Sequence, residues 1–164
     1  MNTDGLKRVA PWLAIAALIA LADQVSKGMV SASLRFGEAR EITGFFNLVL
    51  AHNRGAAFSF LSDAGGWQRM LFIGIAVLAT AVIVAMLARH AGERLFSAGL
   101  ALILGGALGN LWDRIALGYV VDFLDFHAFG WHFWAFNLAD SSITVGAGLL
   151  ILDGLRSAGA AQKV

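Results

Sequence analysis

The chain has 164 residues, of which 59% are hydrophobic and 14% charged, and its mean hydropathy is +0.73. A soluble domain of this size cannot bury so much apolar surface, because about 45–50% apolar residues is already usual, so the composition predicts a multi-pass membrane protein. The net charge of +1 provides no basic field for nucleic acid, and the lack of cysteine excludes disulfides, thiolate nucleophiles and cysteine-bound metals.

The first predicted membrane span covers residues 12–30. Its apolar stretch follows charged residues, as in a secretory signal, and residues 20–22 even fit a small-x-small cleavage site. The helical pattern continues beyond that site, which favours a retained span. Asp23 and Lys27 lie one turn apart in the order that favours an ion pair, so we expect a structural pair outside the proton chemistry. The alternative is that Lys27 reaches the headgroups and Asp23 is hydrated.

Residues 31–67 are polar and rich in glycine, which predicts a surface segment. Within it, residues 42–50 contain many β-branched and aromatic side chains, residues 56–61 are short and apolar, and residues 53–55 fit a turn between them. We therefore expect two short strands joined by that turn. Unpaired strand edges are too costly within lipid, so this segment should lie on the outer membrane surface.

Three further apolar stretches predict spans at residues 70–87, 95–112 and 137–155, each about 27 Å long or more as a helix. Gly105 and Gly109 have the spacing that allows a neighbouring helix to approach closely. Residues 113–136 form a second surface segment. The predicted fold is thus one integral-membrane domain, 1–164, with four transmembrane helices and a small β element.

Four spans place both termini on the same side of the membrane. The 12 Lys and Arg residues divide equally between the two sides. Those on the side of the termini, however, are concentrated in short flanks and in the turn at residues 89–94, which is where basic residues determine orientation. We therefore expect cytoplasmic termini.

Polar residues converge on the outer side in this topology, which is a hypothesis for a site. The simpler interpretation is that each residue is hydrated among the lipid headgroups. This explains Asp122 and Asp140 poorly, because both are embedded in apolar sequence. The converging residues are Asp23, Asn53, Asn110, Arg114, Asp122, Asn137 and Asp140.

A pair of carboxyl groups that shares one proton can hydrolyse a peptide bond, because the ionised group activates water and the protonated group polarises the carbonyl. We predict that Asp122 and Asp140 form this pair. Asp113 and Asp125 are rival candidates. Asp113 adjoins Arg114 and fits an ion-paired helix end, and Asp125 lies three residues after Asp122, on the opposite face of an extended strand.

Other hydrolytic chemistries fit the sequence poorly. No serine lies in a G-x-S-x-G motif, and the histidines lack the HExxH spacing of zinc proteases, so we predict no metal site. The histidines among the aromatic residues of 126–134 fit an interfacial belt instead.

The polar motifs resemble those of the bacterial lipoprotein signal peptidases (signal peptidase II), a family of four-span aspartyl endopeptidases. The resemblance covers nearly the whole chain. Its motifs are DQVSK at 23–27, NRGAAFS at 53–59, GGALGNLWDR at 105–114, GYVVDF at 118–123 and FNLADS at 136–141.

This resemblance implies a catalytic dyad of Asp122 and Asp140. It also implies a β-cradle and a short extramembrane helix on the outer face, no cofactor, and cleavage of diacylglyceryl-modified prolipoproteins just before the lipidated cysteine, at the outer face of the bacterial cytoplasmic membrane. We expect a monomer whose partners are these substrates and membrane lipids. The residues implied to line or support the site are Asp23, Lys27, Asn53, Gly55, Asn110, Arg114 and Asn137.

Two alternatives belong to other functional classes. A proton-coupled transporter could use the two aspartates as a relay, but residues 70–87 and 95–108 contain few polar side chains, and no inverted repeat is visible. A structural membrane subunit would leave the aspartates in apolar sequence unexplained.

Overall fold

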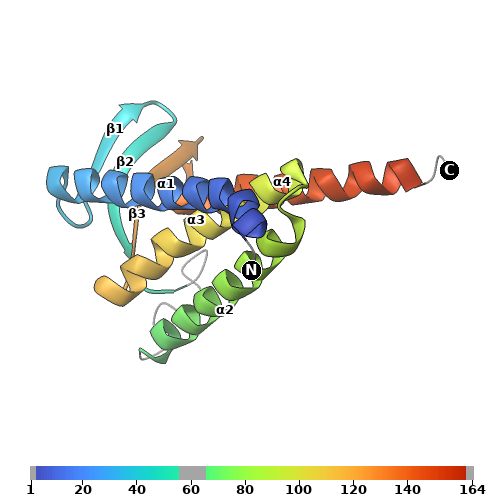
Figure 1. Ribbon diagram of the computed structural model, residues 1–164. Coiled ribbons are helices and arrows are strands. Elements are labelled where there is room, and N and C mark those ends of the chain that lie inside the picture. Colours follow the sequence, from blue (N-terminus) through green and yellow to red (C-terminus); the bar gives the residue numbers. More distant parts are fainter. Residues whose placement is uncertain (1–2, 56–65, 162–164) are drawn as a thin grey trace.

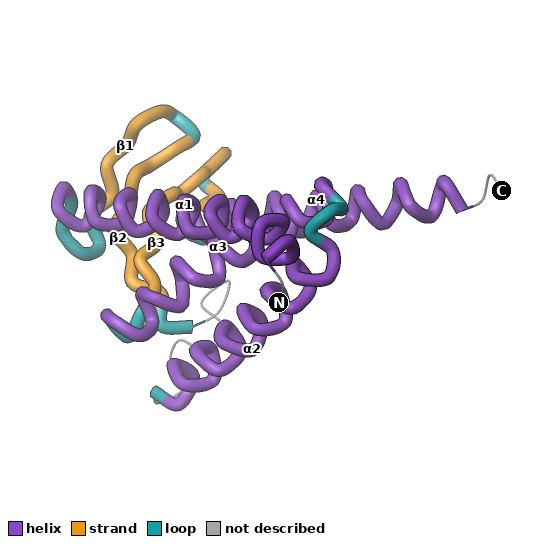
Figure 2. Tube along the Cα trace, viewed as in Figure 1, coloured by secondary structure: helices purple, strands orange, loops and turns teal. Residues whose placement is uncertain are grey.

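The computed structural model describes residues 3–55 and 66–161, which form four long helices and a small antiparallel sheet (Figures 1 and 2). The elements in chain order are α1 (Thr3–Ser33), β1 (Ala39–Thr43), β2 (Phe46–Asn53), α2 (Trp67–His90), α3 (Arg94–Ala116), β3 (Val120–Ala128), β4 (Trp131–His132) and α4 (Leu138–Ala161).

All four helices are long and apolar enough to cross a membrane. Helices α1, α2 and α3 each contain one predicted span and extend beyond both of its ends, and α4 begins one residue after the start of the fourth span and extends beyond its end. A helix continues into the polar interface, where hydropathy no longer marks it. Their outward faces are apolar: Leu18, Leu78 and Leu155 are 64%, 67% and 67% exposed. Exposed apolar side chains of this kind are unfavourable in water and favourable in contact with lipid. The prediction of four membrane helices is confirmed.

Helix α3 lies at the centre of the bundle, and glycines allow its neighbours to approach. A Cβ atom at Gly105 would lie 2.7 Å from the Ala16 carbonyl of α1, and one at Gly106 would lie 2.4 Å from the Ala139 carbonyl of α4. Adjacent glycines thus face two different helices. The close approach predicted from the glycine spacing is confirmed, and it brings α1 and the start of α4 against α3.

The sheet has the order β1-β2-β3-β4, and all neighbouring strands are antiparallel. The prediction of one strand over 42–50 is wrong. Thr43 pairs with Phe46, so a two-residue turn divides that stretch, and β2 continues to Asn53, the first residue of the expected turn. Apolar content did not reveal the hairpin, because Phe45 of its turn continues the apolar and aromatic run into β2. The second predicted strand, 56–61, lies outside the described residues.

The sheet is attached to the bundle through an apolar cluster at the end of α1. This cluster contains Val30 of α1, Leu34 directly after it, Leu50 of β2, and Val121 and Phe123 of β3. The first residues of α1, the α2–α3 turn and the last turns of α4 lie at the end of the bundle away from the sheet (Figure 1). Within residues 3–55 and 66–161, the only helices are these four, so the short extramembrane helix has no counterpart there.

Candidate active site

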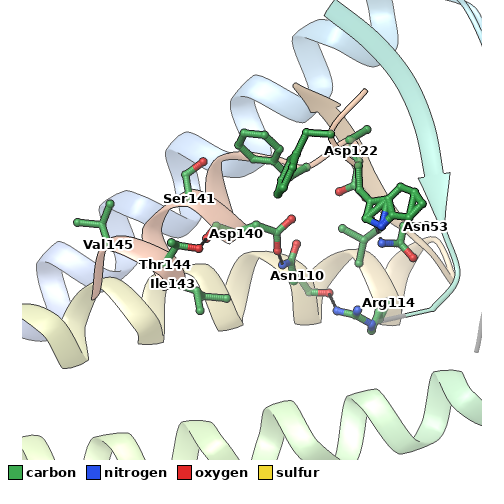
Figure 3. Close-up of a pocket in the computed structure, with 14 residues that line it drawn as sticks. Asn53, Asn110, Arg114, Asp122, Asp140, Ser141, Ile143, Thr144 and Val145 are labelled. Atoms are coloured by element: carbon green, nitrogen blue, oxygen red, sulfur yellow. Dashed lines mark hydrogen bonds between the residues drawn. The ribbon is translucent and has the colours of Figure 1, made fainter. Parts of the chain in front are cut away.

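Asp122 and Asp140 face the same cavity, which has a volume of about 520 Å³. Asp122 lies in β3 and Asp140 lies in the first turn of α4. Their carboxyl groups project into one space from the two elements, with Asn110 of α3 beside them (Figure 3). The structure therefore brings together the two aspartates that the sequence singled out, although they are separated by a β-hairpin and a helix start.

Asn137 connects the two aspartates. Its side-chain Nδ2 donates to Asp122 Oδ1 at 2.7 Å, and its backbone N–H donates to Asp140 Oδ2 at 3.3 Å. Its Oδ1 accepts the backbone N–H of Asp140 at 2.9 Å. The two bonds between Asn137 and Asp140 form a reciprocal capping box at the start of α4. The same local motif that begins the helix thus fixes the position of one carboxyl group relative to the other.

Two further amides hold the outer oxygens of the pair. Asn53 Nδ2 donates to Asp122 Oδ2 at 3.1 Å, and Asn110 Nδ2 donates to Asp140 Oδ1 at 2.8 Å. Each carboxyl group therefore receives hydrogen bonds from both sides. Amide donors restrain a carboxylate without supplying a full positive charge, so they fix its geometry and leave it able to accept a proton.

Burial and the negative charge of Asp140 raise the pKa of Asp122 to about 7, while hydrogen bonds from Asn53 and Asn137 act in the opposite direction. A carboxyl group with this pKa keeps its proton near neutral pH. The cavity can therefore hold one protonated and one ionised carboxyl group, the state required for general acid and general base to act together.

Arg114 closes the side of the cavity nearest the end of α3. Its Nη2 donates to the Gly55 carbonyl at 3.1 Å, and its Nη1 donates to the Asn110 carbonyl at 3.3 Å. The guanidinium carbon lies 5.2 Å from the centre of the Phe72 ring, within range of a cation–π contact. Arg114 thus connects the end of β2, α3 and α2, and it lines the cavity together with Asp122 and Asp140.

A buried ionic cluster lies on the other side of Asn110. Lys27 Nζ is 2.7 Å from Asp23 Oδ2, 2.8 Å from Asp113 Oδ2 and 3.0 Å from Asn110 Oδ1. Gln24 adds a bond of 2.8 Å to Asp113. Because Lys27 can only donate, Asn110 must direct its oxygen toward Lys27 and its NH₂ group toward the cavity. The ion pair predicted between Asp23 and Lys27 is therefore present, and it also fixes the orientation of an amide in the cavity.

Asp113 was interpreted as an ion-paired helix end beside Arg114. It is ion-paired, but its partner is Lys27 of α1, and it is only 1% exposed. Its Oδ2 also accepts the backbone N–H of Val121 at 3.1 Å, next to Asp122 in β3. Adjacent side chains on a helix point about 100° apart, and here Asp113 faces Lys27 of α1 while Arg114 faces the cavity.

Asp125 lies outside the cavity. Its carboxylate accepts from Asn47 Nδ2 at 2.9 Å and contacts His132 Nδ1 at 2.9 Å. The alternation of side chains along β3 explains this, since residues three apart face opposite sides of the sheet. Of the rival carboxylates, neither Asp113 nor Asp125 lines the cavity.

The sequence did not identify the walls of the cavity. One wall is formed by Phe133 and Trp134, which follow β4, and another by Ile143 and Thr144 of α4. Ile143 and Thr144 follow Asp140 at the spacing that places them on its helix face, which was a usable signal. No such signal exists for Phe133 and Trp134, because their position depends on how the chain returns along β3.

Most of the chain is similar to known proteins, both in sequence and in structure. A family model described as signal peptidase (SPase) II matches residues 15–156. The lipoprotein signal peptidase of Paraburkholderia phytofirmans is 58% identical over 148 residues, which cover 90% of this chain and 86% of that protein. The lipoprotein signal peptidase of Ralstonia nicotianae is 58% identical over 155 residues, which cover 94% of this chain and 90% of that protein. A solved bacterial membrane enzyme matches with a TM-score of 0.82 and 32% identity, covering 91% of this chain and 90% of that one.

Proposed function

The chain belongs to the signal peptidase II family, and on that premise we propose that it is an aspartyl endopeptidase acting on diacylglyceryl-modified prolipoproteins. It removes the signal peptide by cutting just before the lipidated cysteine. The observation that supports this most directly is the pair of carboxyl groups, Asp122 and Asp140, which face one cavity and are bridged by Asn137.

The proposed reaction needs one proton on the pair. The ionised carboxylate takes a proton from a water molecule as the water oxygen bonds to the scissile carbonyl carbon. The protonated carboxyl group donates its proton to the carbonyl oxygen, which gives a neutral tetrahedral diol. The newly protonated carboxyl group then gives its proton to the leaving nitrogen, and the C–N bond breaks. At the same time one hydroxyl of the diol returns its proton to the other carboxylate, which regenerates the starting pair.

Asn53, Asn110 and Asn137 position the pair in this proposal, since they bond to its oxygens but cannot exchange protons at neutral pH. Arg114 and Gly55 support the cavity through their mutual bond. Lys27 and Asp23 act one step further away, through Asn110. The two carboxyl groups titrate as a unit, so the roles of acid and base belong to the pair.

The position of the cavity suits a lipid-linked substrate. It extends from the two carboxyl groups along Ile143 and Val145 of α4, a membrane helix, so a peptide bond at the carboxyl groups lies within reach of lipid. Each methylene of a diacylglyceryl chain that stays in lipid contributes about 0.8 kcal/mol to binding. Anchoring the substrate in this way would present the bond beside the lipidated residue to the pair. A relay for proton transport would instead require polar groups along a path through the bundle.

We further propose that the termini and the α2–α3 turn face the cytoplasm of the bacterium and that the sheet and the cavity face the outer side of its cytoplasmic membrane. The two sets lie at opposite ends of the bundle (Figure 1). Because the chain contains no cysteine, single cysteines can test this orientation. Ala128→Cys in β3 should react with a membrane-impermeant thiol reagent added outside, whereas Gly92→Cys in the α2–α3 turn should not. The reverse labelling would invert the proposed topology.

Cleavage by the purified protein tests the activity itself. The full-length chain in detergent is mixed with a diacylglyceryl-modified prolipoprotein, and release of the signal peptide is followed. We expect cleavage of this substrate and little or none of the same prolipoprotein without its lipid. Failure of the wild-type protein to cut the lipidated substrate, under conditions where a relative named lipoprotein signal peptidase cuts it, would refute the proposal.

A further inference from the structure

The β3–β4 hairpin forms a wall of the cavity, and the strand pairing at its tip is short. Strand β4 is two residues long, and its register is limited to His127 with His132 and Ala128 with Trp131. After β4 the chain returns along β3, where Phe133 N–H donates to the Phe126 carbonyl at 2.8 Å. A strand this short at the edge of a sheet contributes little cooperative stability.

The turn of this hairpin is itself unfavourable. Its two central residues, Phe129 and Gly130, have φ values of 53° and 79°. Positive φ at both positions defines the tight hairpin turn that asparagine and glycine favour, whereas a bulky residue such as Phe129 is strained there. The backbone of the turn therefore does not account for the hairpin's position, and side-chain contacts must contribute.

Asp125 supplies those contacts on the face of the sheet away from the cavity. His132 Nδ1 lies 2.9 Å from Asp125 Oδ2 and 3.1 Å from Oδ1, and Asn47 Nδ2 donates to Oδ2 at 2.9 Å. Because an ionised carboxylate only accepts hydrogen bonds, the Nδ1 of His132 must carry a proton. The His132 ring also stacks on His127 at 4.9 Å. One carboxylate thus connects side chains from β2 and β4 to β3.

The residue after His132 points to the cavity. Side chains alternate along a strand, so holding His132 on one face places Phe133 on the other. Between Phe133 and Phe136 the returning chain contains one residue more than the matching stretch of β3 from Phe126 to Leu124. An extra residue of this kind redirects the neighbouring side chains, and Phe133 and Trp134 both line the cavity that contains Asp122.

We propose that Asp125 and His132 form a clip that holds Phe133 and Trp134 as the wall of the cavity, and that both are positioning residues for substrate binding. This inference rests on the proposed function, since the ligand of the wall is the lipidated prolipoprotein. The clip should affect the binding of substrate and not the proton transfers, because neither Asp125 nor His132 reaches Asp122 or Asp140.

Steady-state kinetics of the full-length protein with the lipidated prolipoprotein test the clip. His132→Ala and Asp125→Ala should each raise KM about three- to tenfold, the range that corresponds to one lost hydrogen bond, with kcat within about twofold of wild type. The double variant should be no worse than Asp125→Ala alone, because Asp125→Ala already removes the contact with His132. His132→Asn keeps a donor where Nδ1 was and should restore most of the affinity.

The molecule contains a matched control. His90 Nδ1 lies 2.9 Å from Glu93 Oε1 in the α2–α3 turn, at the other end of the bundle. His90→Ala removes a histidine–carboxylate pair of the same length and should leave KM unchanged. Binding of the lipidated prolipoprotein is also measured in an Asp140→Asn background, so that the result does not depend on turnover and is separate from failure of the proposed chemistry.

Three results would overturn the clip. The first is an unchanged KM and binding affinity in His132→Ala and Asp125→Ala. The second is additive losses in the double variant, which would mean that the two residues act independently. The third is a loss of melting temperature in these variants large enough that the folded protein cannot be isolated, because the pair would then support the whole fold and not one wall.

Discussion

Two pairs of carboxylates lie on opposite sides of Asn110 and differ in what surrounds them. Asp23 and Asp113 are enclosed in the bundle with Lys27 between them. Asp122 and Asp140 face a cavity, and their hydrogen bonds come from amides. Within the described parts of the chain, neither of these two forms an ion pair with a basic side chain.

The difference shows how one residue type serves two purposes in the same molecule. The two carboxylates beside Lys27 have an opposite charge between them, and their bonds join α1 to α3 inside the bundle. A carboxyl group held by amides beside another carboxyl group keeps a proton that it can give away. Asn110 joins the two regions, because its oxygen accepts from Lys27 and its NH₂ group donates to Asp140.

The largest effect expected from this comparison is on catalysis. Asp122→Asn and Asp140→Asn should each reduce kcat by about 10²–10⁴-fold, the range for loss of a general acid or base. Both variants should remain folded, because asparagine retains the shape and can still accept one of the two hydrogen bonds that each carboxylate receives. The cleavage assay is paired with a thermal-shift measurement. Asp125→Asn, outside the cavity, should keep kcat within about twofold of wild type, even where its KM rises through loss of the clip. Turnover by either dyad variant near the wild-type rate would show that the pair is not catalytic.

Removing the lysine should instead affect stability. Lys27→Met leaves Asp23 and Asp113 buried without their counter-charge, and breaking a buried ion pair costs about 3–5 kcal/mol. We expect a lower melting temperature and a lower yield, with activity per folded molecule falling less than in the dyad variants. Asp23→Ala should behave similarly, because Asp23 Oδ1 also accepts the Ala139 N–H at the start of α4. Wild-type stability with no activity would instead place these residues in the chemistry.

The pH dependence of cleavage should reflect the carboxyl pair. Burial and Asp140 raise the pKa of Asp122 to about 7, so the pair loses its shared proton as the pH rises through that value. Cleavage should then fall about tenfold per pH unit above it. Stability should also decrease as the pH rises. The folded state holds this proton more tightly than the unfolded chain, so the free energy of unfolding falls as the pH rises from 3.8 to about 7. A kcat that stays constant up to pH 9 would contradict this.

The smallest expected effect is a loss of stability when the space beside the ionic cluster is filled. A Cβ atom at Gly109 would lie 2.5 Å from Asp23 Oδ2, so Gly109→Ala should displace that carboxylate and cost about 1–3 kcal/mol. Gly74 of α2 is the matched control, because nothing lies within 4 Å of its added Cβ. Gly74→Ala should be neutral or slightly stabilising, as in other helix interiors. Equal melting temperatures for the two variants would show that the cluster adapts.

Local patterns in the sequence account for much of the fold. Runs of apolar residues predicted the four helices, because the thickness of the bilayer imposes one length on every span. Glycine spacing predicted the close approach at Gly105, and the spacing of Asp23 and Lys27 predicted their ion pair. The strands were harder to predict. The hairpin between Thr43 and Phe46 was missed because Phe45, in its turn, continues the apolar and aromatic run.

By itself, the sequence determined the features that depend on spacing along the chain. These are the four spans, the Asp23–Lys27 pair, and the apolar neighbours that singled out Asp122 and Asp140. Only the tertiary structure decided which groups meet across long separations. It paired Asp113 with Lys27 and connected Asp23 to the start of α4, 116 positions along the chain. It also brought Asp125 into contact with His132. The physical reason is that a buried charge must find a partner wherever packing provides one, and packing is a property of the assembled helices and strands.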